Sequence, residues 1–213
     1  MTSGTKRTKA QQAHDIIRQQ IIRCELRPGE LLSEARLVEV TGLGHTPIRD
    51  ALQWLSNEGL VTITARRGTA VAPLNLDDVQ QIFDLRIAIE SVIADQALRH
   101  ITDEHLDALR ELIRILEDGA GPELESDPDI DRRFHETLLD ATGNRYLVSI
   151  YSGLHDASLR LFYLTRCGME PRSQQLDSLR ATLAACTEHD GAALREVLVE
   201  HVKDFRKRVT GAI

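Results

Sequence analysis

The chain has few aromatic residues and no long apolar segment. Aromatic residues make up 4% of its 213 residues, and it contains no run of eighteen apolar residues, which a membrane-spanning helix would need. The N-terminal sequence TSGTKRTKA has no apolar core of the kind found in secretory signals. We therefore expect a cytoplasmic protein that neither spans a membrane nor is secreted.

Cysteines are also few, and they follow no recognisable spacing. The three are Cys24, Cys167 and Cys186. Disulfide frameworks and thiolate zinc sites both need cysteines in patterned groups. This usage is typical of a reducing cytosol and argues against a thiolate metal site.

Charge is divided unevenly along the chain. Residues 1–75 carry ten Lys and Arg and seven Asp and Glu, a net charge of +3. The remainder carries sixteen and twenty-six, a net charge of −10, and the two values account for the total of −7. Phosphates attract a basic segment and repel an acidic one, so this division favours nucleic-acid binding by the first part alone.

One segment, residues 33–72, has β-prone runs as well as helical patterns. Two short helical patterns separated by a Gly-containing turn are followed by two β-prone runs joined at Arg66-Arg67-Gly68. This order is the layout of a winged helix-turn-helix, whose second helix fits the major groove of DNA and whose hairpin can reach the backbone or the minor groove. The alternative is a small helical subdomain with a solvated arginine pair.

The second helix of this unit is expected to start with Thr46 as its N-cap and Pro47 at its first helical position, and to stop at Gly59. Its apolar residues recur at helical spacing. They are Ile48, Ala51, Leu52 and Leu55. This spacing leaves His45, Thr46 and Arg49 at the exposed N-terminal end, where a recognition helix meets DNA.

The rest of the unit follows from similar local signals. Ser33 is expected to cap the first helix, and Gly42 to supply the turn. The expected wing strands contain Val61 and Ile63 on one side and Ala70 and Val71 on the other. Arg66 and Arg67 then lie at the tip of the wing.

Helical patterns account for the remainder of the chain. An amphipathic helix over about 8–25 is expected to stop at Arg27-Pro28-Gly29, and a linker near Pro73-Leu74-Asn75 separates a first domain, 1–73, from a second, 74–213. Six helices are expected in the second domain, over about 76–100, 103–117, 129–141, 145–166, 172–188 and 190–209. Six amphipathic helices without strands predict an antiparallel bundle, so the fold class is mainly α.

Asp131, His135 and His201 are the residues of this domain that suggest a binding site. Asp131 and His135 are four apart on one helix and emerge on one face, and His201 lies on the apolar stripe of the last helix. Burial of a carboxylate and two imidazoles is costly unless they pair or bind something. These groups suit zinc, nickel, manganese or iron. Alternatively, His201 is a core histidine bonded to a neighbour. His155, one turn after Tyr151, is a candidate substitute ligand, but we expect it at the helix surface or a pocket edge.

Several motifs resemble a known family. SEARLVEVTGLGHTPIRDALQWLSNEGLV resembles the winged-helix head of GntR-type bacterial transcription regulators. LRIAIE, DRRFHETLLDATGN and HDGAALREVLVEHV resemble the FadR-type effector domain of that superfamily, so the resemblance covers about residues 10–208. It implies a DNA-binding repressor whose homodimer places two recognition helices roughly 34 Å apart on a pseudo-palindromic operator. A small organic acid bound in the bundle would modulate operator affinity.

The head departs from the family where the recognition helix begins. The family commonly has Ser-Arg-Thr-Pro there, and this chain has Gly44-His45-Thr46-Pro47. An imidazole offers at most one useful donor in place of a bidentate guanidinium, so a different operator preference is expected. An arginine common early in the preceding helix is Ala35 here, with Arg36 beside it. The resulting DNA-binding set is Arg49, Thr46, His45, Arg36, Arg66 and Arg67.

The effector domain departs from the family at one metal ligand. Many relatives bind a metal through Asp, His four residues later, and two further His spaced twenty-two apart. Counting back from His201 gives Leu179, so Asp131, His135 and His201 remain. Three ligands hold a metal if water or an effector carboxylate completes the shell. Alternatively, the metal is lost and the histidines bind an organic acid directly.

Two further residues occupy family signature positions. Arg86 is expected either to meet an anionic effector or to pair with Glu90 one turn later, and Asn144 either contacts the effector or closes a helix after Gly143. The effector-binding set is therefore Arg86, Asn144, His135 and His201.

Two other functions are compatible with parts of this pattern. A constitutive DNA-binding regulator with a non-functional effector site would explain Leu179. A two-His-one-carboxylate iron enzyme would use Asp131, His135 and His201, but no general base, nucleophile or phosphate loop accompanies them. We expect no enzyme activity.

Overall fold

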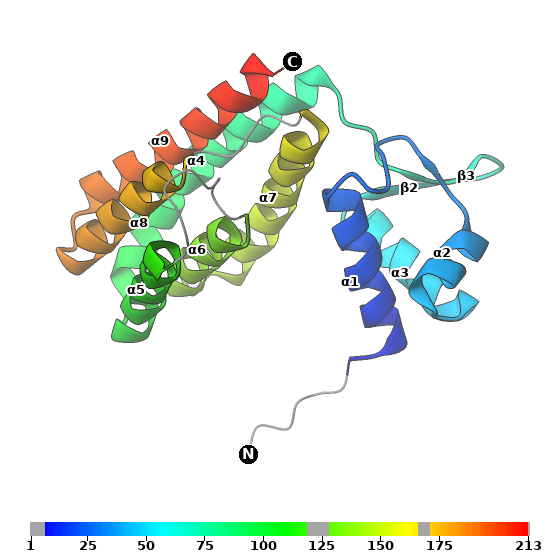
Figure 1. Cartoon of the computed structure of the whole chain (residues 1–213), viewed down its shortest axis with the longest axis horizontal. Helices are drawn as coiled ribbons and strands as arrows, with labels where there is room; N and C mark the ends of the chain where they lie inside the picture. The colour runs from blue at the N-terminus through cyan, green and yellow to red at the C-terminus, as the bar shows by residue number, and fades with distance from the viewer. Residues whose placement is uncertain (1–6, 119–127, 166–170, 213) are drawn as a thin grey trace. The chain divides into compact units, whose positions relative to one another are not determined.

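The computed structural model describes residues 7–118, 128–165 and 171–212, and most of them are helical (Figure 1). They form two compact units, a head made of Met1–Asp78 with Leu159–Leu164 and a bundle made of Val79–Ser158 with Thr165–Ile213. None of the helices in the described ranges combines the length and the apolar character that crossing a membrane requires. Cys167 lies outside the described residues.

The head is a winged helix-turn-helix preceded by one further helix. In chain order its elements are α1 (Lys9–Ile22), β1 (Leu31–Leu32), α2 (Glu34–Thr41), α3 (His45–Asn57), β2 (Val61–Thr64) and β3 (Gly68–Val71). Side chains of α1, α2, α3 and the sheet pack into one apolar core that includes Ile17, Leu37 and Leu55. The predicted order of helix, turn, helix and hairpin is confirmed.

Helix α1 begins where its sequence provides a capping box and ends earlier than expected. The Thr8 hydroxyl accepts a hydrogen bond from Gln11 N, and the Gln11 side chain accepts one from Thr8 N. The expected end near residue 25 was wrong, because the helix ends at Ile22 and Cys24 has a φ of 55°. A left-handed residue at this point prevents the helix from continuing.

Helices α2 and α3 confirm most of the predicted signals, with one correction. The Ser33 side chain caps α2 by accepting from Arg36 N, and Gly42 ends it with a left-handed φ of 69°. The expected start of α3 was wrong, because the helix begins at His45 with Gly44 in the N-cap position. Pro47 is therefore the third helical residue. A proline is tolerated there because N–H groups of the first turn have no partner within the helix.

The wing is a three-stranded sheet in the order β1-β3-β2. Strands β2 and β3 are antiparallel, with Val61 opposite Val71 and Thr64 opposite Gly68, as the hairpin prediction implied. Strand β1 pairs with β3 and was not predicted, because two residues carry no periodic signal. Arg66 has a φ of 70° and stands in the turn between the hairpin strands.

The six expected helices make up the part of the bundle that the structure describes. They are α4 (Leu76–His100), α5 (Asp103–Asp118), α6 (Pro128–Ala141), α7 (Arg145–Thr165), α8 (Arg172–Thr187) and α9 (Gly191–Gly211). Helix α9 runs antiparallel to α4 (Figure 1). Two ion pairs show this direction, since Arg195 pairs with Asp95 and Arg206 pairs with Asp84. The mainly α fold class is confirmed.

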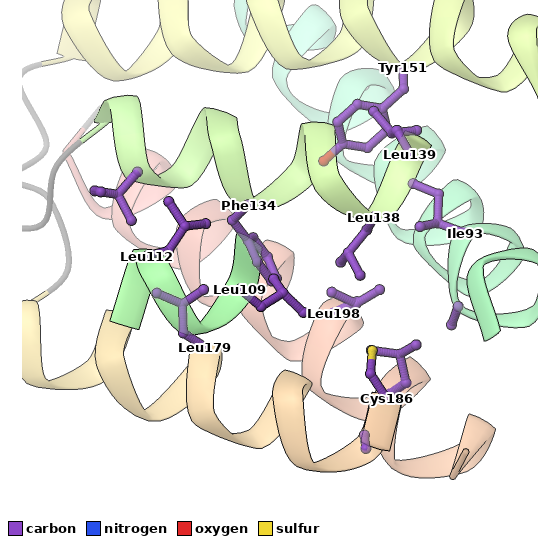
Figure 2. Packing of buried hydrophobic residues seen from close by; sticks show 14 of the residues in the cluster. Ile93, Leu109, Leu112, Phe134, Leu138, Leu139, Tyr151, Leu179, Cys186 and Leu198 are labelled. Carbon is purple, nitrogen blue, oxygen red and sulfur yellow. The ribbon is translucent and has the colours of Figure 1, made fainter. Parts of the chain in front are cut away.

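The core of the bundle lies between these helices (Figure 2). Phe134 and Leu138 of α6 face Leu109 of α5 and Leu198 of α9, and all four side chains are buried. Leu179 of α8 belongs to the same cluster and is 2% exposed, as its apolar stripe predicted. This core fixes the inner faces of α6 and α9, which carry Asp131, His135 and His201.

Candidate functional site

The N-terminal end of α3 presents polar side chains to solvent. His45, Thr46 and Arg49 are exposed, whereas Ile48 and Leu52 of the same helix are buried in the head. Packing of the apolar face therefore orients the polar face outward. Backbone N–H groups and the helix dipole also make a helix N-terminus favourable for phosphate.

Two acidic residues pair with cations at this surface. Arg49 Nε donates to Glu34 Oε2 over 2.8 Å, and His45 Nδ1 lies 3.9 Å from the same oxygen. Arg36 Nη1 donates to Glu30 Oε1 over 3.3 Å. These pairs could not be expected from the sequence, since residues 34 and 49 meet only through the packing of α2 on α3.

The wing carries the other two predicted cations. Arg66 and Arg67 are exposed, and neither forms an ion pair within the described part of the chain. Their charges are therefore available to a polyanion without the loss of an internal partner.

In the bundle, Asp131, His135 and His201 come together as predicted. One ligand atom from each lies within 4.8 Å of the others. Asp131 Oδ1 is 2.9 Å from His201 Nε2 and 3.7 Å from His135 Nε2. Helix α6 contributes the first two residues one turn apart, and α9 contributes the third.

A buried hydrogen-bond network supports His135 from the other side. The Tyr151 hydroxyl donates to Glu90 Oε1 and accepts from Arg86 Nη2, each over 2.8 Å. It also lies 2.8 Å from His135 Nδ1. Since its one proton goes to Glu90, the hydroxyl must accept from His135 Nδ1–H. His135 Nε2 then carries no proton, and its lone pair can accept from Arg86 Nη2 or bind a metal.

The ionisation states of this network follow from burial and charge. Burial lowers the pKa of His135 well below its ordinary value and favours the neutral imidazole. Burial also acts to raise the pKa of Asp131, but the neighbouring histidines, among them His201 through its hydrogen bond, outweigh it, and that pKa lies below its usual range. Ionised carboxylate and neutral imidazole are the forms that ligate metals.

These three residues fit a divalent metal in number, chemistry and spacing. Two ligand atoms each about 2.1 Å from one ion are at most about 4.2 Å apart, so the observed distances require only small adjustments. His135 also has the outer-shell hydrogen bond through Nδ1 that metal-bound histidines usually make. Leu179 supplies no fourth donor. Asp131 and His201 also line a small pocket with Ile130, Phe134, Gln175, Ser178 and Leu179.

Arg86 lies in this network rather than at the surface. It is 1% exposed, and its Nη2 lies 3.6 Å from Glu90 Oε1, so the predicted intrahelical pair forms. Arg86 Nη2 is also 3.5 Å from His135 Nε2. Tyr151 and Glu90, which join Arg86 to His135, were not predicted as site residues.

The structure also shows the surroundings of Asn144 and His155. The Asn144 side chain accepts from Tyr146 N and Leu147 N and thus caps α7, and its amide donates to Gln96, so none of these hydrogen bonds joins it to the cluster. His155 was expected at the helix surface or at a pocket edge, and the surface position was wrong. This residue is 6% exposed, and its ring centroid is 5.6 Å from that of His135.

The class that these features define is a winged-helix transcription regulator with a helical second domain, and comparison with known proteins agrees. Residues 9–71 match the family described as bacterial regulatory proteins, gntR family, and residues 81–204 match the FCD domain. The chain belongs to the GntR family of transcription regulators and carries an FCD domain. It is a regulator and not an enzyme.

Relatives of known sequence cover almost the whole chain. The chain is 25% identical to the uncharacterized HTH-type transcriptional regulator YdhC of Bacillus subtilis, over 89% of this chain and 92% of that protein. It is 24% identical to the HTH-type transcriptional repressor RspR of Escherichia coli, over 93% and 88%. It is 26% identical to the repressor GlaR of the same organism, over 87% and 89%.

Solved structures show the same fold. The chain is similar to McbR/YncC of Escherichia coli with a TM-score of 0.77 and 18% identity, covering 97% of this chain and 99% of that one. It is also similar to a putative GntR regulator from Rhodococcus sp. RHA1, with a TM-score of 0.67, 19% identity and coverage of 96% and 99%.

Proposed function

We propose that this regulator is a repressor that binds a pseudo-palindromic operator as a homodimer and responds to a small carboxylate. In this proposal residues 1–73 bind DNA, and residues 74–213 bind the effector and form the dimer. RspR and GlaR are both named repressors, which supports repression rather than activation. The observation that carries the DNA-binding part is the outward position of Arg49, Thr46 and His45 at the start of α3.

Gel-shift assays with DNA from the protein's own promoter region test the first part. The wild type is expected to bind, with an affinity that falls steeply as salt rises, because phosphate contacts release counterions. Arg49→Ala is expected to lose about 1–3 kcal/mol of binding free energy if Arg49 contacts a base edge. Arg110→Ala is the matched control, because Arg110 is exposed on α5 and, among the described residues, its ion pair is a local one with Asp107. Equal binding by Arg49→Ala and the wild type would contradict the proposal.

For the bundle, we propose that Asp131, His135 and His201 hold zinc, nickel, manganese or iron. A bound metal would supply a Lewis-acidic centre for an effector carboxylate. Tyr151 would orient His135, and Arg86 would add positive charge close to the effector. The short distances among the three ligand atoms support this part of the proposal.

Elemental analysis of the purified protein, followed by thermal-shift screening with organic acids, tests the effector site. We expect stoichiometric metal in the wild type, its loss in His201→Ala and a higher melting temperature with a matching carboxylate. His189→Ala is the control, because His189 lies between α8 and α9 outside the cluster. A metal-free wild type that gains stability from a carboxylate would instead favour direct binding of the acid by the histidines.

Effector binding changes operator affinity only if the effector binds two arrangements of the protein unequally. Operator titrations with and without the acid found in the screen measure this coupling.

A second candidate, a constitutive regulator with a non-functional effector site, is favoured by Leu179, which contributes no donor atom. Absence of any stabilising metal or acid would select that candidate.

A further inference from the structure

Glu34, the first residue of α2, contacts the exposed end of α3. Its Oε2 accepts a hydrogen bond from Arg49 Nε over 2.8 Å and lies 3.9 Å from His45 Nδ1. Arg49 and His45 are two of the side chains expected to meet DNA. One carboxylate of the preceding helix therefore lies next to both.

The atoms used in this pair leave Arg49 able to bind a base. Glu34 contacts Nε, and within the described residues Nη1 and Nη2 of Arg49 have no hydrogen-bond partner. Two parallel N–H groups of a guanidinium match O6 and N7 of guanine. Restraint of the side chain before binding reduces the conformational entropy that is lost when the complex forms.

Fold stability does not explain the pair. The Arg49 side chain is 69% exposed and that of Glu34 is 36% exposed, and ion pairs of this kind add little to the free energy of unfolding. A carboxylate at this surface also repels the phosphates of any DNA that approaches. The consequences of Glu34 are therefore expected in DNA binding and its selectivity.

We propose that Glu34 is a positioning residue for sequence-specific DNA binding. It orients Arg49 toward one base pair of each operator half-site, and its negative charge weakens binding to other DNA. The inference rests on the proposed operator binding.

The test is in vitro selection from a random duplex library with purified full-length protein. Wild type, Arg49→Ala, Glu34→Gln and Glu39→Gln are compared. Glu39→Gln is the matched control, because Glu39 is exposed on the same helix and makes no hydrogen bond or ion pair among the described residues. It removes the same charge without touching Arg49.

We expect Arg49→Ala and Glu34→Gln to lose base preference at the same position of the half-site. Glu34→Gln is expected to lower the ratio of operator to non-operator affinity by about tenfold, since one bidentate base contact supplies discrimination of this order. Glu39→Gln should keep both the preference and the ratio. Glu34→Asp, which retains the charge, should recover part of the ratio.

Other results would overturn the inference. If Glu34→Gln retains the preference that Arg49→Ala loses, Glu34 does not position Arg49. If Arg49→Ala loses no base preference, Arg49 does not read a base, and the inference is equally wrong. If Glu34→Gln raises the affinity for all DNA equally, Glu34 only repels phosphates and does not position Arg49.

The melting temperature of Glu34→Gln separates positioning from a structural role, because a positioning residue changes selectivity while the melting temperature stays near that of Glu39→Gln. Failure of the proposed function gives a different result: the wild type itself would then enrich no sequence.

Discussion

Two candidate site arginines, Arg49 of the head and Arg86 of the bundle, have opposite surroundings. Arg49 has a 69% exposed side chain and, within the described ranges, one ion-pair partner, whereas Arg86 is 1% exposed and contacts Tyr151, Glu90 and His135. An exposed cation can exchange its partner for phosphate or a base at little cost. A buried cation is fixed by partners whose loss leaves charges unsatisfied. Substitution of Arg49 should therefore change DNA binding, whereas substitution of Arg86 should change stability as well.

Arg86→Met should have the largest effect on stability. It leaves Glu90 buried without its ion-pair partner, and removal of one partner of a buried pair costs about 3–5 kcal/mol. Denaturant unfolding of the full chain measures the loss. Arg49→Ala should change the free energy of unfolding by no more than about 0.5 kcal/mol. Similar losses of unfolding free energy in Arg86→Met and Arg49→Ala would contradict the difference between the two arginines.

The double variant Arg86→Met/Glu90→Leu sharpens this prediction. Replacement of both charges removes the uncompensated carboxylate, so the double variant should be more stable than Arg86→Met alone. A double variant less stable than the single one would mean that other interactions of Glu90, such as that with Tyr151, dominate.

Tyr151→Phe should have an intermediate effect. It removes the hydroxyl shared by Arg86, Glu90 and His135, and loss of a buried hydrogen-bond partner costs about 1–3 kcal/mol. Loss of this outer-shell partner should also weaken metal binding by about 10–100-fold. Zinc titration beside denaturant unfolding measures both. Tyr146→Phe is the control, since Tyr146 is exposed on the same helix.

Leu179→His tests the missing ligand. The new imidazole would lie beside Asp131 and His201 in the pocket that these residues line, so zinc affinity should rise. Without metal, the variant should be less stable by roughly 1–3 kcal/mol, because an imidazole replaces a buried leucine. Unfolding with zinc and with a chelator separates the two effects. Unchanged zinc affinity would argue against a metal at this cluster.

The smallest effects are expected at the wing. Arg66→Ala and Arg67→Ala should each reduce the slope of log affinity against log salt by about one, because each variant neutralises one phosphate fewer. The unfolding free energy should not change, because both side chains are exposed and form no ion pair among the described residues. Salt titrations of operator binding measure the slope. A wing that does not touch DNA would leave it unchanged.

Local signals in the sequence were sufficient for most of the fold. The six bundle helices begin and end within two residues of expectation, because apolar periodicity and helix ends are encoded nearby in the chain. The start of α3, the end of α1 and strand β1 were missed. Each depends on backbone conformation or pairing with distant residues, as the positive φ of Cys24 and the pairing of Leu31 with Ala70 show.

The sequence also predicted part of the candidate site. Asp131 and His135 share a helix face, and His201 lies on an apolar stripe, so their convergence could be expected from the sequence. Tyr151 of α7 joins His135 of α6 to Glu90 of α4 through hydrogen bonds, and Glu34 meets Arg49 through the packing of α2 on α3. Such interactions depend on tertiary structure, which single-sequence patterns do not contain.

The most direct test of the central claim is a fluorescence-anisotropy titration of a selected operator duplex with wild type and Arg49→Ala at two salt concentrations. The account predicts that the wild type prefers the operator to a scrambled duplex, that salt weakens its binding, and that Arg49→Ala loses the preference while remaining folded. Equal operator preference in the two proteins would contradict the assignment of α3 as the recognition helix.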